Sequence, residues 1–254
     1  MSERSEKHNV AMLAKTSQPY QLIFSQGALL TPTLNKHIIQ WRDKDGKPFP
    51  PEDLIPQRVG IIWGYGLYYG DLSCVGISWA QHTLQKDPEI FNSLPSSEKF
   101  CTLAVSCLLK SGDDRFIIAK RSARVSVYKN LWHVSAAGWV DLDTALITQG
   151  AVEQVYTELK EEVNLDPEHI SRLNQLGICI HLVKGSNFME ICFLAETPLA
   201  SQAVLEFAQD AKDKWEGKYH SFDAAELEKM IVGDEVFNPA GAATIMMALD
   251  IPFA

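Results

Sequence analysis

The sequence predicts an α/β (α+β) protein, a sandwich in which helices lie outside a mixed sheet. Two observations predict it: short β-rich segments and helical segments interleave along the second half of the chain, and no internal repeat or low-complexity tract interrupts them. With 254 residues, 46% of them hydrophobic, the chain is long enough for one large domain or two small ones. A packed core is therefore expected.

Residues 1–99 are predicted to form a small β-rich N-terminal region after a frayed start. Short strands are expected at 20–30 and 37–43, and a helix at 79–94. Between them, residues 58–79 combine aromatic side chains with five glycines, which favours a buried β-hairpin. An exposed dimerisation face is the alternative for this block. The polar segment 93–100 marks the boundary with a second region, 100–254.

The second region begins with two β-rich strings joined by a turn at 111–114. A short strand ending at Gly138, a loop and a helix over 149–163 follow. The remaining expected elements are strands at 176–183, 189–196 and 218–222, and helices at 199–211, from Asp223, and at 239–250.

Composition excludes several classes of protein. A net charge of −9 and a pI near 5.3 argue against a protein that covers a nucleic-acid backbone, although a single phosphorylated small molecule remains compatible with them. The five cysteines are odd in number and scattered, as expected for reduced core residues. Because the start lacks an apolar signal segment and no run reaches membrane-spanning length, a cytoplasmic protein is expected.

Three glutamates mark the chemistry of the predicted helix at 149–163. Glu158, Glu161 and Glu162 are spaced i, i+3 and i+4, which places them on one helical face. Such a charged run is also typical of a solvated surface. Carboxylate oxygens are the ligands that Mg²⁺ prefers, so the cluster is a candidate metal site.

The string from Thr157 to Leu165 resembles the signature of the Nudix hydrolases, and the resemblance extends over roughly residues 100–254. All three glutamates and the aliphatic positions match. Four features depart from the signature: Thr157 stands for Arg, Gln149 for Glu, Asn164 for the closing Gly, and the loop after Gly138 is longer. In the family the Arg and Glu pair and steady the first catalytic glutamate, so Glu158 is expected to be held less firmly here. Asn164 suits the left-handed conformation that ends a helix.

The resemblance implies a Nudix-like α/β/α sandwich and a hydrolase that depends on Mg²⁺ (or Mn²⁺). Its substrate would be a nucleoside diphosphate linked to another moiety, such as a nucleotide sugar, a dinucleotide or a nucleotide. Glu158, Glu161 and Glu162 would be the catalytic and metal-binding residues, with the Gly138 carbonyl as a further metal ligand. The general base is expected to be Glu158 or Glu162, with Glu190, Glu196 and Glu216 as candidates from later segments.

Other side chains are candidates for substrate binding. Arg121 and Arg124 are expected to bind phosphate through bidentate hydrogen bonds, with Lys120 as a weaker candidate. Aromatic residues that present a face for a base are Trp132, Trp139, Tyr128 and Phe188. His133 precedes Gly138 on a predicted strand, where a histidine is more often a structural residue than a ligand.

Several alternatives stay open. The missing Gln149/Thr157 pair also fits a catalytically weak or inactive Nudix-fold protein that binds nucleotides or regulates. An isopentenyl diphosphate isomerase is disfavoured, because the chain lacks that enzyme's cysteine string, and RNA decapping is disfavoured by the acidic charge. The N-terminal region would extend the sheet, form a homodimer, or shape the pocket.

Overall fold

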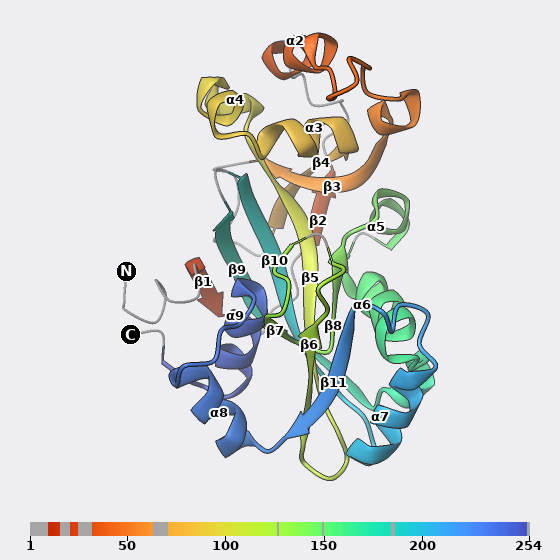
Figure 1. The fold of residues 1–254 in the computed structure, drawn as a ribbon. Helices are drawn as coiled ribbons and strands as arrows, with labels where there is room; N and C mark the ends of the chain where they lie inside the picture. Colours follow the sequence, from red (N-terminus) through yellow and green to blue (C-terminus); the bar gives the residue numbers. More distant parts are fainter. Residues whose placement is uncertain are drawn as a thin grey trace.

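The computed structural model describes residues 10–15, 21–24, 32–62, 71–125, 127–148, 150–183 and 186–252 (Figure 1). They form an α+β fold around one mixed sheet of eleven strands. β10 runs parallel to β5, and β2 runs parallel to β4, while the other strand pairs are antiparallel. The expected fold class is confirmed.

The strands follow the main order β1-β9-β10-β5-β3-β4-β2, with β8 and β6 also paired to β5, and β7 and β11 paired to β6. Their bounds are β1 Val10–Lys15, β2 Gln21–Phe24, β3 Pro56–Ile62, β4 Asp71–Ser78, β5 Phe100–Lys110, β6 Phe116–Arg121, β7 Trp132–His133, β8 Ala136–Trp139, β9 Arg172–Val183, β10 Ser186–Glu196 and β11 Gly217–Phe222. The α-helices are α2 Pro32–Gln40, α3 Trp79–Gln85, α4 Pro88–Ser93, α5 Leu142–Thr148, α6 Val152–Glu158, α7 Ser201–Gln209, α8 Ala224–Val232 and α9 Pro239–Ala248. A π-helical turn, Leu159–Val163, continues α6.

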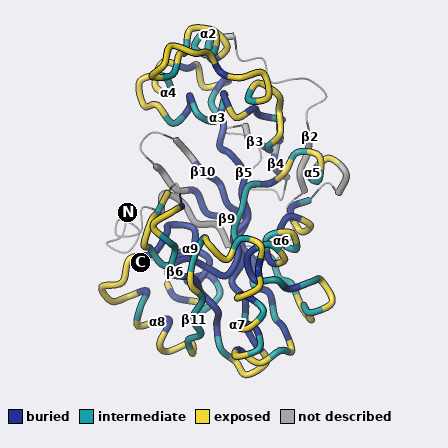
Figure 2. Tube along the Cα trace, turned by 45° about the vertical axis from the view of Figure 1, so that its right-hand side comes forward, coloured by how far each residue is buried: buried dark blue, intermediate teal, exposed yellow. Residues whose placement is uncertain are grey.

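β5 is the centre of the molecule. One edge pairs with β10, and the other pairs in succession with β3, β8 and β6. Its side chains alternate between two cores: Leu103 and Val105 pack in the core that contains α6 and α7, whereas Leu108 packs in the core of α8 and α9. Helices thus cover both faces of a buried sheet, as the sandwich prediction requires (Figures 1 and 2).

The N-terminal region extends this sheet. β3 and β4 form the hairpin expected at 58–79, with Ile61 opposite Cys74, while its loop at 63–70 lies outside the described residues. β3 then pairs with the start of β5, and Val59 and Ile61 lie in the same core as Leu103. Of the three roles left open for this region, sheet extension is therefore observed. The boundary at residue 99 stays a prediction.

The strand expected at 37–43 is wrong, because residues 32–40 form the helix α2. Pro32 opens α2, and the buried carboxylate of Glu98 accepts hydrogen bonds from the backbone N–H groups of Thr33 and Leu34. A carboxylate stabilises a helix N-terminus by accepting the N–H groups that have no partner inside the helix. That cap comes from a distant part of the chain, so a local pattern could not reveal it.

The predicted helix at 79–94 is two helices, α3 and α4. Pro88 has no N–H to continue α3, and Asp87 caps the new helix by accepting hydrogen bonds from the N–H groups of Glu89 and Ile90. The loop expected after Gly138 is also partly wrong, since it contains α5. Asp141 begins that helix by accepting a hydrogen bond from the N–H of Thr144.

The frayed start is partly wrong, because Val10–Lys15 forms β1 and pairs with β9. Other expected elements agree with the structure. The turn at 111–114 joins β5 to β6, and Asp223 caps α8 in a capping box with Glu226. The five cysteines are buried free thiols. Within the described parts of the chain, none of the helices has the length and apolar character that crossing a membrane needs.

Candidate active site

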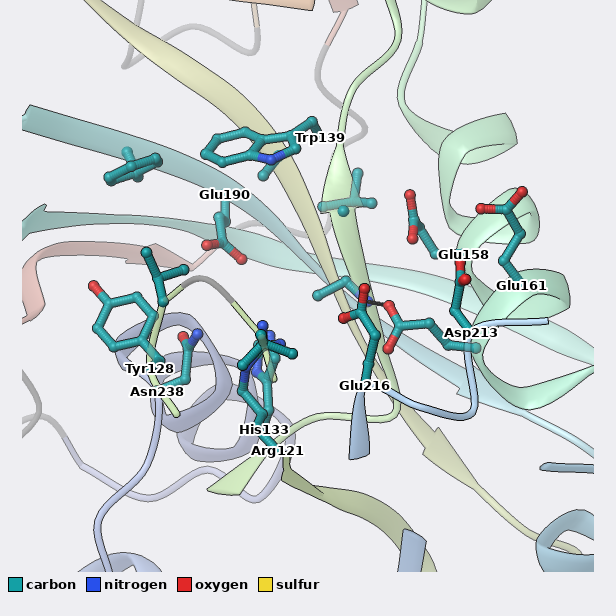
Figure 3. Close-up of a pocket in the computed structure, with 18 of the residues that line it drawn as sticks. Arg121, Tyr128, His133, Trp139, Glu158, Glu161, Glu190, Asp213, Glu216 and Asn238 are labelled. Carbon is teal, nitrogen blue, oxygen red and sulfur yellow. Dashed lines mark hydrogen bonds between the residues drawn. The ribbon is translucent and has the colours of Figure 1, made fainter. Parts of the chain in front are cut away.

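A cavity of about 900 Å³ opens beside α6 and β8. Its walls come from both predicted regions of the chain, because β3 and α3 contribute residues alongside β8, β10, α6 and the segment before β11. In Figure 3, Glu158, Glu161, Asp213 and Glu216 gather on one side of the cavity, and Tyr128 and Asn238 lie on the other. The three glutamates of the predicted cluster all line this cavity.

The apolar stripe of α6 decides which way its glutamates point. Val155, Leu159 and Val163 are fully buried against the sheet. Val152 is exposed and Tyr156 is half-buried, so these two apolar residues of the helix lie outside the buried stripe. The helix begins at Val152 rather than at residue 149. Asn164 ends the π-helical turn with φ 61°, as predicted for a left-handed cap.

Gly138 is the reason that Glu158 can approach β8. A Cβ atom at position 138 would lie 1.9 Å from Oε1 of Glu158 and 2.2 Å from its Cδ. No other residue type leaves this space, since every other side chain begins with a Cβ. The carboxylate therefore rests on the backbone of β8. Ligation of a metal by the Gly138 carbonyl stays a prediction.

Gln154 holds Glu158 in place. Its Nε2 donates a 2.7 Å hydrogen bond to Oε1 of Glu158, and its own Oε1 accepts a 3.0 Å hydrogen bond from the N–H of Asp141. Thr157 instead donates to the backbone carbonyl of Glu153, and Gln149 lies outside the described residues. Gln154 thus gives Glu158 a hydrogen-bonded support that the sequence analysis did not indicate. The buried amide of Gln154 is one helical turn upstream of Glu158, and this i, i+4 spacing was the available signal.

Glu162 is the most enclosed of the three glutamates. Its Oε1 accepts a 2.9 Å hydrogen bond from the N–H of Ala137, and Tyr219 donates a 3.4 Å hydrogen bond to its Oε2. Burial raises the pKa of Glu162 well above its usual range, and the charge of Glu158 adds to the effect. The pKa of Glu158 is raised to about 7, again mainly by burial, although the hydrogen bond from Gln154 opposes the shift. Burial and neighbouring acids thus favour the protonated form of both carboxyl groups.

Glu161 differs from its neighbours because it forms an ion pair. Nζ of Lys212 lies 2.5 Å from its Oε1. Across the described residues, no three side chains of His, Cys, Asp or Glu converge closely enough to hold a metal ion. The glutamates share a wall of the cavity, but they do not meet at one point as the spacing suggested.

Two further acids lie beside the glutamates, in the segment before β11. The N–H of Asp213 donates a 2.9 Å hydrogen bond to the carbonyl of Glu161, which fixes this segment to the π-helical turn. Burial and the charge of Asp213 raise the pKa of Glu216, whereas Arg121 lowers it. Sequence reasoning missed Asp213, because only the tertiary fold brings it to α6.

Arg121 and Lys212 are the cations that act on these acids. The charge of Arg121 also lowers the pKa of Glu162, and its buried Nε has no hydrogen-bond partner among the described residues. Arg124 lines the same cavity. Lys120 instead points to Glu235 and Trp132, at 3.8 Å and 4.6 Å, and is not part of the cavity wall.

The other candidates divide between the cavity and the rest of the molecule. Glu190, Tyr128, His133, Trp139 and Phe188 line the cavity. Glu196 lies outside it beside Arg172, at 3.8 Å, and Trp132 also lies outside. Four of the cavity residues that the sequence did not indicate come from the N-terminal region: Gln57, Arg58, Trp79 and Lys86. This region therefore also shapes the pocket.

Comparisons with known proteins found likeness only among solved structures. No family model matches the chain, and neither does a curated protein. Tm1382, a proposed Nudix hydrolase, is 18% identical, with a TM-score of 0.44 over 60% of this chain and 73% of its own. The MutT protein of Methanosarcina mazei Go1 is 18% identical, with a TM-score of 0.40 over 60% of this chain and 95% of its own.

A third solved structure, the Ap4A hydrolase of C. elegans, is 12% identical, with a TM-score of 0.37 over 60% of this chain and 99% of its own. The likeness to these structures spans about three-fifths of the chain. Of these three structures, Tm1382 carries the Nudix name that the sequence motif suggested.

Proposed function

We propose that this protein is a divalent-metal-dependent hydrolase that cleaves the pyrophosphate bond of a nucleoside diphosphate linked to another moiety. One observation carries the proposal. α6 and its π-helical turn bring Glu158 and Glu162 to one wall of a cavity of about 900 Å³, and burial raises the pKa of both carboxyl groups. Buried acids with raised pKa values in a cavity are typical of functional sites.

Carboxylate oxygens are the donors that a hard divalent cation prefers, so side chains that do not converge in the described structure would have to move together to hold one. Glu158, Glu161, Glu162, Asp213 and Glu216 line the cavity together, and Arg121 and Lys212 are the cations that act on them. Glu158 and Glu162 would hold Mg²⁺ or Mn²⁺, and Glu161 would join them on leaving Lys212. A bound cation would neutralise phosphate charge and activate a water molecule.

The protein's own groups would bind and orient the substrate. Arg121 has a buried Nε without a partner in the described structure, so a phosphate oxygen would satisfy this donor. Gln154 keeps Glu158 beside Gly138 through a hydrogen bond that the backbone of Asp141 anchors. Glu158 and Glu162 remain the proposed general bases, and Glu190 and Glu216 are the alternatives that also line the cavity.

A second function is favoured by the ion pair between Glu161 and Lys212. If that pair persists with ligand bound, one of the three carboxylates is withheld from a metal. The protein would then be a catalytically weak or inactive Nudix-fold protein that binds nucleotides or regulates.

A substrate screen distinguishes the two functions. Nucleotide sugars, dinucleotides and nucleoside triphosphates are incubated with Mg²⁺ or Mn²⁺, and both phosphorylated products are measured. Metal-dependent turnover that falls at least about a hundredfold in Glu162→Gln supports the hydrolase, since removing one charge-stabilising group costs that much. The matched control is Glu153→Gln, an exposed glutamate on the same helix.

Unchanged turnover in Glu162→Gln contradicts the assignment of the metal site. Saturable nucleotide binding without product release in the wild-type protein supports the second function instead. Circular dichroism of each variant verifies that the fold is retained.

A further inference from the structure

The end of the cavity formed by the N-terminal region carries two cations. Arg58 lies on β3 and Lys86 directly follows α3. The guanidinium of Arg58 lies 4.5 Å from the ring centre of Trp79 and 5.3 Å from that of Trp139. The ammonium of Lys86 lies 5.5 Å from Trp79 and 5.8 Å from Phe188. All five residues line the cavity.

No acid compensates these cations within the described structure. Burial lowers the pKa of Arg58 and of Lys86, and the charge of Arg58 lowers that of Lys86 further. Neither side chain forms a hydrogen bond or ion pair with a described residue, and Nη1 of Arg58 is buried without an acceptor. Two half-buried cations that repel each other are costly to maintain without an anion.

The arrangement favours an anion over a nucleobase as the occupant. Because Arg58 lies over Trp79 and also approaches Trp139, the cation itself occupies the space at these rings where a base would stack. A guanidinium over a ring keeps the N–H groups at its edge available, and these suit the oxygens of a phosphate. The aromatic residues therefore act as supports that fix the direction of Arg58.

This cationic end lies close to the glutamates and is distinct from them. Gly138 of β8 contacts Glu158, and the next residue, Trp139, contacts Arg58. Both ends line the same cavity of about 900 Å³, so one nucleotide-sized molecule can contact both. The cation that lowers the pKa of Glu162 is Arg121, whereas Arg58 acts on Lys86 and His82.

We propose that Arg58 and Lys86 form a subsite for a second anionic group of the substrate, a phosphate monoester carried by the same molecule as the pyrophosphate. This inference rests on the proposed function, because it presumes that the pyrophosphate binds beside the glutamates. The substrate class is thereby narrowed to pyrophosphates that carry an additional phosphate.

Two matched pairs of ligands test the subsite: NADP⁺ against NAD⁺, and coenzyme A against its dephospho form. Each pair contains the same pyrophosphate and differs by one phosphate monoester. Binding is measured by calorimetry and by the fluorescence of the tryptophans in the Glu162→Gln variant with Mg²⁺ present, in which turnover is expected to be slowed at least about a hundredfold. The phosphorylated member of at least one pair is expected to bind about tenfold tighter, the effect of one charge-assisted hydrogen bond.

Substitution of both Arg58 and Lys86, beside a control at an exposed lysine, distinguishes loss of the subsite from a general change in the charge of the protein. In the double variant Arg58→Gln with Lys86→Gln, the affinity ratio of the discriminated pair is expected to fall to about one. The control Lys44→Gln removes an exposed cation in the Asp43–Lys47 turn, which does not line the cavity, and should leave the ratio unchanged. Arg58→Lys retains the charge without the planar fork and should give an intermediate ratio.

Equal affinity within both pairs overturns the inference, and so does a ratio that survives in the double variant. Tight binding of inorganic phosphate, combined with equal affinity for the two members of each pair, also overturns the inference. The subsite would then bind a free anion and not a phosphate of the substrate. Since the measurement does not use turnover, failure of the subsite and absence of hydrolysis are separate results.

Discussion

Burial and a hydrogen bond shift the pKa of Glu158 in opposite directions. The protonation of this one residue can be followed by measuring stability against pH. Burial raises its pKa to about 7, and the hydrogen bond from Gln154 lowers it only in part. In the unfolded chain a glutamate titrates near pH 4.5. Between these two values the folded chain holds a proton that the unfolded chain has lost, so the free energy of unfolding falls as pH rises from about 4.5 to about 7.

Glu158→Gln should reduce this dependence, although Glu162 and Glu216, whose pKa values are also raised, still contribute to it. The substitution is expected to raise the free energy of unfolding at pH 8 by up to about 3 kcal/mol relative to the wild type, after subtraction of any difference at pH 4.5. Urea unfolding between pH 4.5 and 8 measures it. His82, whose pKa burial lowers to about 3, contributes with the opposite sign but equally in both proteins. A difference between the two proteins that stays constant over this range would contradict the prediction.

At the scale of one element, the side-chain amide of Gln154 links α6 to Asp141 in the segment after β8. Gln154 accepts a hydrogen bond from the N–H of Asp141 and donates one to Glu158. The arginine and glutamate of the Nudix signature are absent from this sequence, and a neutral side chain within the helix supports Glu158. Neutral support adds no positive charge, so it leaves Glu158 fully available to a cation.

Gln154→Ala is expected to reduce metal-dependent turnover and apparent Mg²⁺ affinity by about 10- to 100-fold, the usual effect of losing a group that orients a metal ligand. Titration of activity with Mg²⁺ measures the change. The control Thr157→Ala alters the same helix but removes only a hydrogen bond to the backbone of Glu153. Equal effects of the two substitutions would show that general helix stability, rather than the position of Glu158, is responsible.

The whole molecule depends on β5 and on the N-terminal strands that cover one part of its edge. β3 pairs with β5 from Phe100 to Thr102, and Val59, Ile61 and Leu72 pack in the principal core. A separate core under α2 and α3, which includes Leu34, Ile77 and Phe100, joins these helices to the start of β5. Removing residues 1–99 would expose apolar side chains from both cores and leave an open strand edge.

A chain of residues 100–254 alone is therefore expected to lose cooperative thermal unfolding and to bind a hydrophobic dye. Calorimetry and dye fluorescence of this shorter chain, beside the full chain, measure both properties. A cooperative transition within a few degrees of the full chain would instead establish 100–254 as an independent domain, as the sequence predicts.

The sequence by itself determined those features that depend on neighbouring residues. The i, i+3, i+4 spacing of Glu158, Glu161 and Glu162 placed them on one helix, and Asn164 and Asp223 marked a helix end and a helix start. Strings rich in apolar and β-branched residues located most of the strands, because a strand buried on both faces has a nearly continuous apolar sequence. The resemblance of one short motif to the Nudix signature followed from the same local information.

The tertiary structure decided whatever depends on residues distant along the chain. Glu98 caps the helix at residues 32–40 from more than sixty positions away along the chain. Lys212 forms an ion pair with Glu161, one of the three clustered glutamates. Arg58 and Trp79 reached the cavity because β3 joins β5, a pairing that no local pattern encodes. Local periodicity records which face of an element is buried, whereas the partner that covers this face is chosen only when the whole chain packs.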